Sequence, residues 1–187
     1  GIIVRNRNDL YGLPAQMNLV VGRLSMNSKG FGFVVPGSPD EIKKGDVFIP
    51  SAMLNSAMNN DRVIVRLSQI SSNGRSREGE IIRIIEHANK QIVGTFEKNT
   101  SFGFVTPDDS KLMQDIFIHK RNFNGAEVGT KVVVEIVRWA RKHQNPEGKI
   151  IKVLGKINDP GIDILSVINQ YELQIGRASC RERVSSP

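Results

Sequence analysis

The sequence predicts a mainly β chain made of two consecutive small domains of one kind. A short motif occurs twice, at residues 29–34 (KGFGFV) and at residues 101–105 (SFGFV). Each copy is followed by a proline, an acidic stretch and a second apolar run, at residues 46–50 (DVFIP) and 115–119 (DIFIH). From this second run onward the two copies keep a constant offset of about 69 residues, which indicates a duplicated domain of roughly that size.

The composition favours a polyanionic partner. The 187 residues include 26 lysines and arginines against 19 acidic residues, a formal net charge of +7. No apolar run approaches the roughly 18–20 residues that span a membrane, so we expect no membrane association. The only cysteine, Cys180, lies in the C-terminal tail that we expect to be non-native. The rest of the chain has no cysteine and so no disulfide, which fits a reducing, cytoplasmic location.

The repeated motif predicts phenylalanines on an outer surface. Side chains alternate across a strand, so Phe31 and Phe33 share one face while Val34 takes the other. In the following strand the two aliphatic neighbours of Phe48 form the natural core face, which leaves Phe48 on the opposite side. A single strand phenylalanine is more often buried, but here the same phase recurs in both copies. We also expect the glycine between the phenylalanines to open the backbone to a ligand.

The elements of the first domain follow in chain order. Five strands are expected at residues 19–24, 31–34, 46–50, 61–67 and 80–85, because apolar residues alternate there. A helical turn is expected at residues 51–58, with Ser51 as its N-cap.

The second domain repeats this plan between residues 92 and 154, and only residues 86–91 separate the two. After it, Asp159 followed by Pro160 predicts the start of a helix of about three turns.

The motifs at residues 29–34 and 46–50 resemble the paired ribonucleoprotein motifs of the cold-shock domain. That domain is a five-stranded OB-type barrel that binds single-stranded RNA or DNA. Two such domains in tandem, with REGEII closing the first and VGTFEK opening the second, resemble the N-terminal half of the ribonuclease II family of exoribonucleases. The resemblance runs from about Ile3 to Gln174.

The resemblance implies how the chain is divided. It places OB barrels at residues 18–88 and 89–157, after a winged-helix remnant and connector at residues 1–17. Residues 158–174 would form a linker helix toward an absent catalytic domain. The tail at residues 175–187 resembles a translated sequencing adapter and is expected to be non-native.

The aromatic and basic residues of the two motifs are the candidate binding residues for single-stranded RNA. The expected stacking residues are Phe31, Phe33, Phe48, Phe102, Phe104, Phe117 and His119. The expected phosphate-binding residues are Lys29, Arg62, Arg66, Lys98 and Lys131. The second copy departs from the family pattern at Thr100-Ser101, which stand in place of Lys-Gly.

We predict no catalytic residue and no metal site in this chain. The three histidines, His87, His119 and His143, fall in different elements without ligand spacing. The acidic pairs at residues 40–41 and 108–109 are expected to be solvated turns. By resemblance, magnesium and its aspartates belong to the absent catalytic domain, which hydrolyses RNA from the 3′ end.

The function expected from these observations is a monomeric RNA-binding module that guides substrate to an exoribonuclease, without a small-molecule substrate of its own. A stand-alone RNA chaperone with two cold-shock domains is the first alternative, and a protein-interaction OB module is the second. Whether the basic loop at residues 138–143 contacts RNA stays open.

Overall fold

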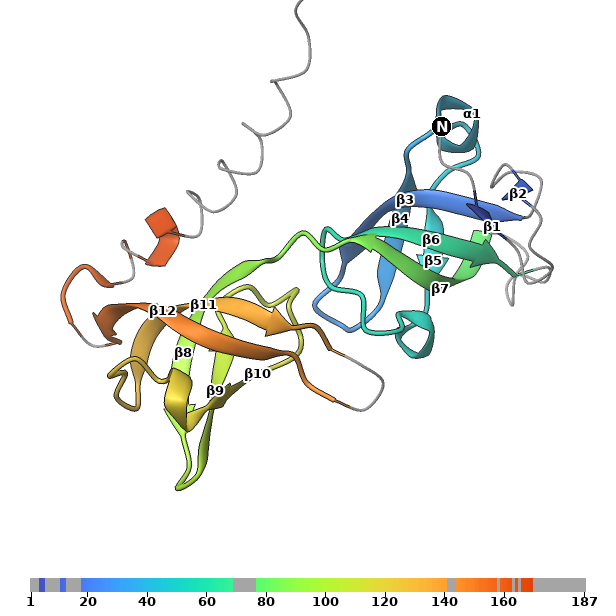
Figure 1. Ribbon diagram of the computed structural model, residues 1–187. Helices are drawn as coiled ribbons and strands as arrows, with labels where there is room; N and C mark the ends of the chain where they lie inside the picture. Colours follow the sequence, from blue (N-terminus) through green and yellow to red (C-terminus); the bar gives the residue numbers. More distant parts are fainter. Residues whose placement is uncertain are drawn as a thin grey trace, which may run out of the picture. The chain divides into compact units, whose positions relative to one another are not determined.

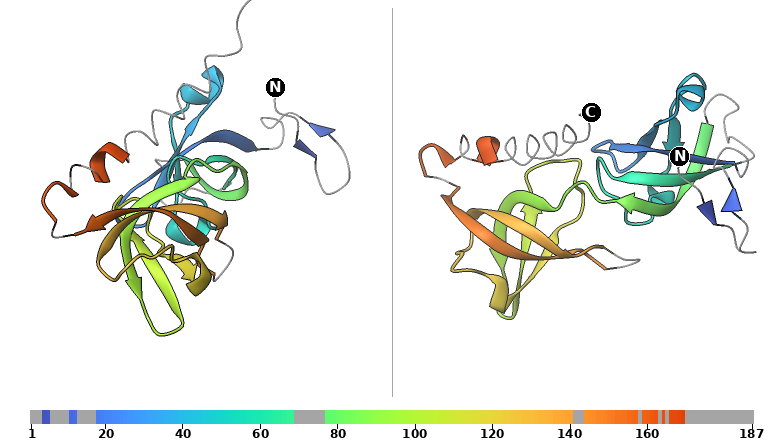
Figure 2. Two further views of the ribbon diagram at one scale, coloured as in Figure 1. Left: turned by 60° about the vertical axis from the view of Figure 1, so that its left-hand side comes forward. Right: turned by 45° about the horizontal axis from the view of Figure 1, so that its top comes forward.

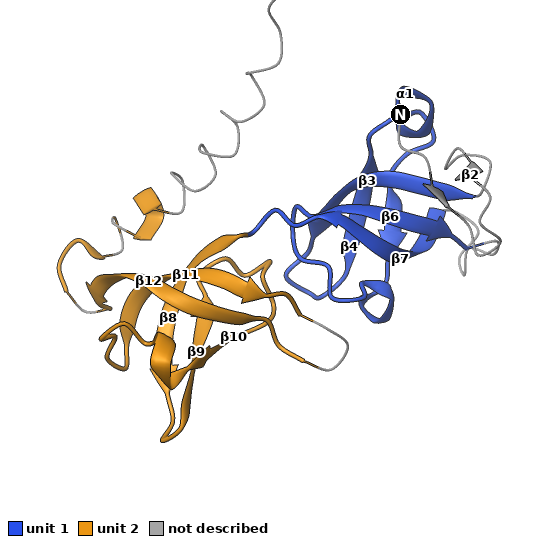
Figure 3. Ribbon diagram, viewed as in Figure 1, with its two compact units in different colours: residues 1–89 blue, residues 90–187 orange. Residues whose placement is uncertain are grey.

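The computed structural model describes residues 4–5, 11–12, 18–68, 77–140, 144–157, 159–162, 164 and 166–169. The chain divides into two compact units, residues 1–89 and 90–187, and each contains one closed β-barrel (Figures 1 and 3). The prediction of a mainly β chain with two five-stranded barrels is therefore confirmed.

The first barrel has five strands, which are β3 (Leu19–Met26), β4 (Gly32–Pro36), β5 (Val47–Ile49), β6 (Arg62–Leu67) and β7 (Arg77–Glu86). Their order around the barrel is β3-β4-β5-β7-β6, and β3 pairs with β6 to close it. All neighbours are antiparallel except β5 and β7.

The second barrel repeats this topology with β8 (Gln91–Lys98), β9 (Phe102–Pro107), β10 (Ile116–His119), β11 (Thr130–Arg138) and β12 (Glu147–Lys156). Its one parallel pair is β10 with β12, in the place that β5 and β7 hold in the first barrel. The two additional views in Figure 2 show the strands of each barrel curving around its interior. Closure leaves neither sheet with a free edge, which suits domains of this size.

Each barrel interior is filled by the aliphatic side chains that alternate along the strands. The first core contains Val20, Leu24, Met26, Val34, Val47, Ile49, Ala57, Val63, Val65 and Ile81. The second contains Ile92, Phe96, Val105, Ile116, Ile118, Val132, Val134 and Ile150. Alternate residues of each strand remain outside the core, where they form the outer surface of the barrel.

Glycines at one pair of equivalent positions confirm the offset of the repeat in three dimensions. A Cβ atom on Gly79 would lie 2.4 Å from a methyl of Val65, and a Cβ atom on Gly148 would lie 2.4 Å from the corresponding methyl of Val134. Any side chain at either position would therefore collide with the neighbouring strand in the core.

One short helix replaces an expected turn. The acidic pair at residues 40–41 lies in α1 (Pro39–Ile42), which has proline in its first turn. Glu41 forms ion pairs with Lys44 and Arg77, and hydrogen bonds from these two side chains lower the pKa of its carboxyl. The expectation of a simple solvated turn is wrong here, because Arg77, 36 residues away, recruits this carboxylate.

Two 3₁₀ turns, η2 (Ser51–Met53) and η3 (Lys120–Asn122), follow β5 and β10. The predicted N-cap at Ser51 is wrong, since the cap position belongs to Pro50 and no side chain caps the turn.

Beyond the barrels, residues 162, 164 and 166–169 are helical, as the Asp159-Pro160 signal predicts. Residues 4–5 (β1) and 11–12 (β2) form a two-stranded antiparallel ladder. The proposed non-native tail at residues 175–187 lies outside the described residues. Within the described part of the chain, no helix is both long and apolar enough to cross a membrane.

A buried carboxylate organises the end of the first barrel. Asp61 is fully buried, and its carboxylate accepts hydrogen bonds from the backbone amides of Met58 at 3.0 Å and Ala88 at 2.8 Å. His87 Nδ1 lies 2.9 Å from the same carboxylate. Burial raises the pKa of Asp61, whereas these hydrogen bonds and the charge of His87 act to lower it. Asp61 thus ties residues 87–88, which leave the barrel, to the turn before β6.

We expect Asp61→Ala to destabilise the first barrel by about 2 kcal/mol or more, because two amides lose their acceptor in a buried site. Urea unfolding monitored by hydrogen exchange of the β6 amides measures this change. Asp46→Ala removes an exposed carboxylate from the same unit and should cost about 0.5 kcal/mol or less. Equal losses of stability in the two variants would contradict the assigned role of Asp61.

Candidate nucleic-acid interface

Three phenylalanines of the first barrel form an aromatic cluster on its outer surface. Phe31 precedes β4, Phe33 lies within β4, and Phe48 lies opposite Phe33 on β5. Their ring centroids are 5.6–5.8 Å apart. Phe33 is 40% exposed, whereas the adjacent Val34 is fully buried. The prediction that the phenylalanines of this strand face outward and Val34 faces inward is confirmed. We call Phe31, Phe33 and Phe48 platform 1.

The second barrel carries the same arrangement. Phe102 and Phe104 on β9 face Phe117 on β10, with ring centroids 5.3–5.7 Å apart. His119 extends this cluster, because its ring centroid lies 4.8 Å from that of Phe117. We call these four half-buried residues platform 2. Pro50 occupies the place of His119 in the first barrel, so platform 1 has no fourth ring.

The glycines between the phenylalanines face inward. Gly32 and Gly103 are buried, and a Cβ atom would lie 2.8 Å from Leu24 Cδ1 at Gly32 or 2.5 Å from Phe96 Cε2 at Gly103. The expectation that these glycines open the backbone to a ligand is therefore wrong. They are required because a large core side chain occupies the space beneath each platform.

The predicted basic residues lie in different surroundings. Lys29, Arg62, Arg66 and Lys98 are exposed. Lys131 is mostly covered, and its Nζ lies 2.6 Å from Oδ1 of Asp108. Asp108 is therefore a bonded residue rather than a simple solvated turn, and the positive charge of Lys131 is already matched.

Only part of this basic set is close to platform 1. Arg62 pairs with Arg23 on β3, two residues from Ser25, which lies opposite Phe33. Arg66 pairs with Leu19 at the other end of β3, roughly 20 Å along the strand from the row that contains Phe33. The barrel therefore places Arg62 beside the aromatic cluster and Arg66 away from it.

A carboxylate borders each platform, and the sequence reasoning missed both. Glu78 on β7 lies next to Phe48, and Glu147 on β12 lies next to Phe117, through the two parallel strand pairs. Glu78 and Glu147 are 69 residues apart, which is the offset of the repeat, so the repeat could have identified them as equivalent positions. Each platform thus has a carboxylate on the side of its parallel strand pair, and in the second barrel this carboxylate is paired with Arg138.

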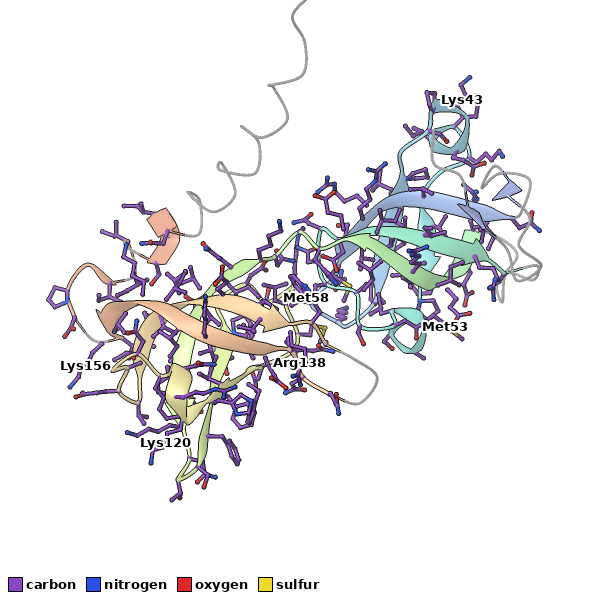
Figure 4. All side chains as sticks on the ribbon, in the orientation of Figure 1. Lys43, Met53, Met58, Lys120, Arg138 and Lys156 are labelled. Carbon is purple, nitrogen blue, oxygen red and sulfur yellow. The ribbon has the colours of Figure 1, made fainter. Side chains whose placement is uncertain are left out.

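Glu147 also restrains the rim of platform 2. Its carboxylate is 2.9 Å from Arg138 Nη1 and 3.5 Å from His119 Nε2. Figure 4 labels Arg138 at the end of β11, where it begins the basic loop. Residues 141–143 of that loop, including His143, lie outside the described residues.

Among the residues that the structure describes, no group of three or more histidine, cysteine, aspartate or glutamate side chains is arranged to hold a metal ion. The described site consists of aromatic rings with charged side chains around them.

Comparisons with known proteins match both barrels. The profile of the ribonuclease B OB domain matches residues 22–84, and that of the cold shock domain matches residues 104–175. The chain is 36% identical over 157 residues to ribonuclease R of Thermotoga maritima, covering 83% of this chain and 21% of that protein. It is 33% identical over 174 residues to ribonuclease R of Vibrio parahaemolyticus, covering 92% of this chain and 20% of that protein. The chain thus spans about a fifth of the length of these relatives.

Solved structures have the same fold over most of the chain. The apo form of Mycoplasma genitalium RNase R gives a TM-score of 0.72 at 19% identity, covering 82% of this chain and 24% of that one. The same protein in complex with ribose methylated single-stranded RNA gives a TM-score of 0.70 at 19% identity, covering 80% of this chain and 23% of that one.

Proposed function

Over its two barrels this chain belongs to the ribonuclease R family, and on that premise we propose that the barrels bind single-stranded RNA and guide it to an exoribonuclease active site. In this proposal the catalytic aspartates, their magnesium and the 3′ to 5′ hydrolysis of RNA belong to another part of the parent protein. The role of the present chain is to capture the strand and hold it for delivery.

The aromatic platform is the observation that carries the proposal. Each barrel presents at least three rings on the outer faces of two adjacent strands, with the aliphatic residues of those strands turned inward. Stacking of an unpaired base on such a ring contributes about 1–3 kcal/mol and is tolerant of base identity. A face of this kind suits a protein that must accept many RNA sequences.

The charge of the chain supports an RNA partner. The formal net charge is +7, and lysines or arginines lie exposed on the strands and loops of both barrels. Binding to a polyanion releases counterions, so the affinity must fall as salt increases.

The proposal is tested by fluorescence anisotropy with labelled oligouridine at two salt concentrations. We expect saturable binding that weakens at the higher salt. Failure to bind oligouridine at low salt would overturn the proposal, and binding that is insensitive to salt would favour the protein-interaction alternative. The guiding role needs the intact parent enzyme, in which platform variants should slow degradation of long strands more than that of very short ones.

The two barrels are expected to bind RNA in different ways. The second copy lacks the Lys-Gly of the first at residues 100–101, and Lys131 is neutralised by Asp108. Each lost phosphate contact lowers the salt slope of single-strand binding by roughly 0.7, so the separated first barrel should show the steeper slope. The second should depend more on stacking, aided by His119. Equal salt slopes for the two separated barrels would refute this prediction.

A further inference from the structure

Two arginines of the first barrel lie directly opposite each other on its outer surface. Arg23 on β3 pairs with Arg62 on β6, and both side chains are exposed. Like charges at directly opposed positions of a sheet are destabilising. A bound anion between them would remove that repulsion.

Neither arginine has a carboxylate partner among the described residues. The Nη1 of Arg23 donates to the backbone carbonyl of Asn60 at 3.3 Å. Glu86 on β7 lies opposite Arg62, next to a shift in the strand register, and forms no ion pair with it. The Asn60 contact holds one guanidinium in place and leaves its other donors available.

The arginine pair borders platform 1 on the side away from its glutamate. Arg23 lies next to Val35 across the β3–β4 ladder, and Ser25 lies next to Phe33. Arg23 and Ser25 are alternate residues of one strand, so the two rows are about 7 Å apart on the same face. Glu78 borders the platform on the opposite side, next to Phe48. The two arginines and the glutamate therefore lie on opposite sides of the aromatic cluster.

The second barrel has no such pair. Thr95 and Lys131 pair at the corresponding positions of β8 and β11. The amide of Gly37 donates to the carbonyl of Val21 on β3 at 3.0 Å. The amide of Asp108 donates in the same way to the carbonyl of Val93 on β8, also at 3.0 Å. The two positions are thus equivalent, and the carboxylate that binds Lys131 is absent from the first barrel.

A second difference between the two barrels also makes the region beside platform 2 more acidic. Glu97 lies opposite Phe104 in the second barrel, at the place that Ser25 takes opposite Phe33 in the first. The region beside platform 2 therefore carries two carboxylates, Glu97 and Asp108, where the first barrel carries Ser25 and Gly37. At these matched positions of the described strands, the first barrel carries two arginines without a carboxylate partner, whereas the second carries Lys131 paired with Asp108.

We infer that Arg23 and Arg62 form a phosphodiester-binding site of the first barrel, which holds the backbone of a strand whose bases stack on platform 1. The described residues of the second barrel include no counterpart of this site. The inference rests on the proposed function, and it fixes the side of the platform along which the phosphates run. Guanidinium groups suit this role because their planar donors bind two phosphate oxygens at once.

The test measures oligouridine affinity and salt slope for the full chain and its Arg23→Gln and Arg23→Lys variants. We expect Arg23→Gln to lower the salt slope by about 0.7 and the affinity by about five-fold. Arg23→Lys keeps the charge and should keep most of the slope. Lys43→Gln removes an exposed charge that follows α1, labelled in Figure 4, and should leave the slope unchanged.

A gain of function tests the comparison between barrels. Asp108→Gly places the first-barrel residue at the equivalent position and frees Lys131, so the salt slope of the full chain should rise by up to about 0.7. This variant does not depend on damaging the protein, and circular dichroism checks that each variant is folded.

The outcomes separate this inference from the proposed function. If Arg23→Gln keeps the parent slope and affinity while alanine at Phe31 and Phe102 weakens binding as predicted, the phosphodiester site is wrong and RNA binding stands. If the parent chain does not bind oligouridine, both proposals are wrong. If Arg23→Gln and Lys43→Gln reduce the slope equally, the effect is one of net charge and the site is wrong.

Discussion

Replacing Phe31 and Phe102 together by alanine is expected to weaken binding of oligouridine by about 2 kcal/mol or more, because each residue contributes one stacking ring to its platform. Phe31 is the ring of platform 1 that precedes β4, and Phe102 holds the same position in platform 2. Both rings are partly exposed, so removing them leaves the cores intact. Fluorescence anisotropy at constant salt gives the loss directly.

The matched control removes apolar side chains that lie outside the platforms. Ile42 and Val128 are each 54% exposed, one in each unit, and the Ile42→Ala/Val128→Ala variant should bind as the parent does. If the phenylalanine variant also binds as the parent does, the stacking assignment and the residues named for it must be withdrawn.

A second large effect, on stability, is expected from a phenylalanine of the second barrel whose side chain faces the core. Phe96 on β8 is fully buried, packs 4.9 Å from Phe123 between ring centroids, and lies directly under Gly103. Phe96→Ala should destabilise the second barrel by about 3–5 kcal/mol, because it removes buried apolar surface and leaves a cavity. Urea unfolding followed by the fluorescence of Trp139, the single tryptophan, measures this loss.

Phe104→Ala is the appropriate comparison, since it makes the same substitution on the outer face of the same barrel. It loses ring contacts with Phe102 and Phe117, which are worth about 1 kcal/mol, and it creates no cavity in the core. Similar losses of stability for Phe96→Ala and Phe104→Ala would mean that the two faces of the sheet are not distinguished as described.

The two faces could be predicted because strand alternation is a local property. The residues on either side of Phe48 are aliphatic and fully buried, and the same holds around Phe117. A period of two residues needs no knowledge of the neighbouring strand, so the aromatic faces follow from the sequence. The recurrence of the motif at a constant offset predicts two copies of one barrel for the same reason.

The roles of the charged residues and the glycines could not be predicted in this way. The ion pair of Asp108 with Lys131 joins residues 23 apart, and that of Glu41 with Arg77 joins residues 36 apart. The inward direction of Gly32 depends on Leu24, which belongs to another strand. In each case the partner is brought close by the tertiary arrangement of the barrel, which no local pattern specifies.

The sequence by itself determined the duplicated barrel, the outward aromatic residues and the basic character of the chain. Only the tertiary structure decided which charges are neutralised and which remain available beside the platforms. Arg23 and Arg62 are 39 residues apart in the chain, and the β3–β6 ladder alone brings them together. The physical reason is that alternation is set within one strand, whereas the electrostatic surroundings of a residue are set by the strands packed against it.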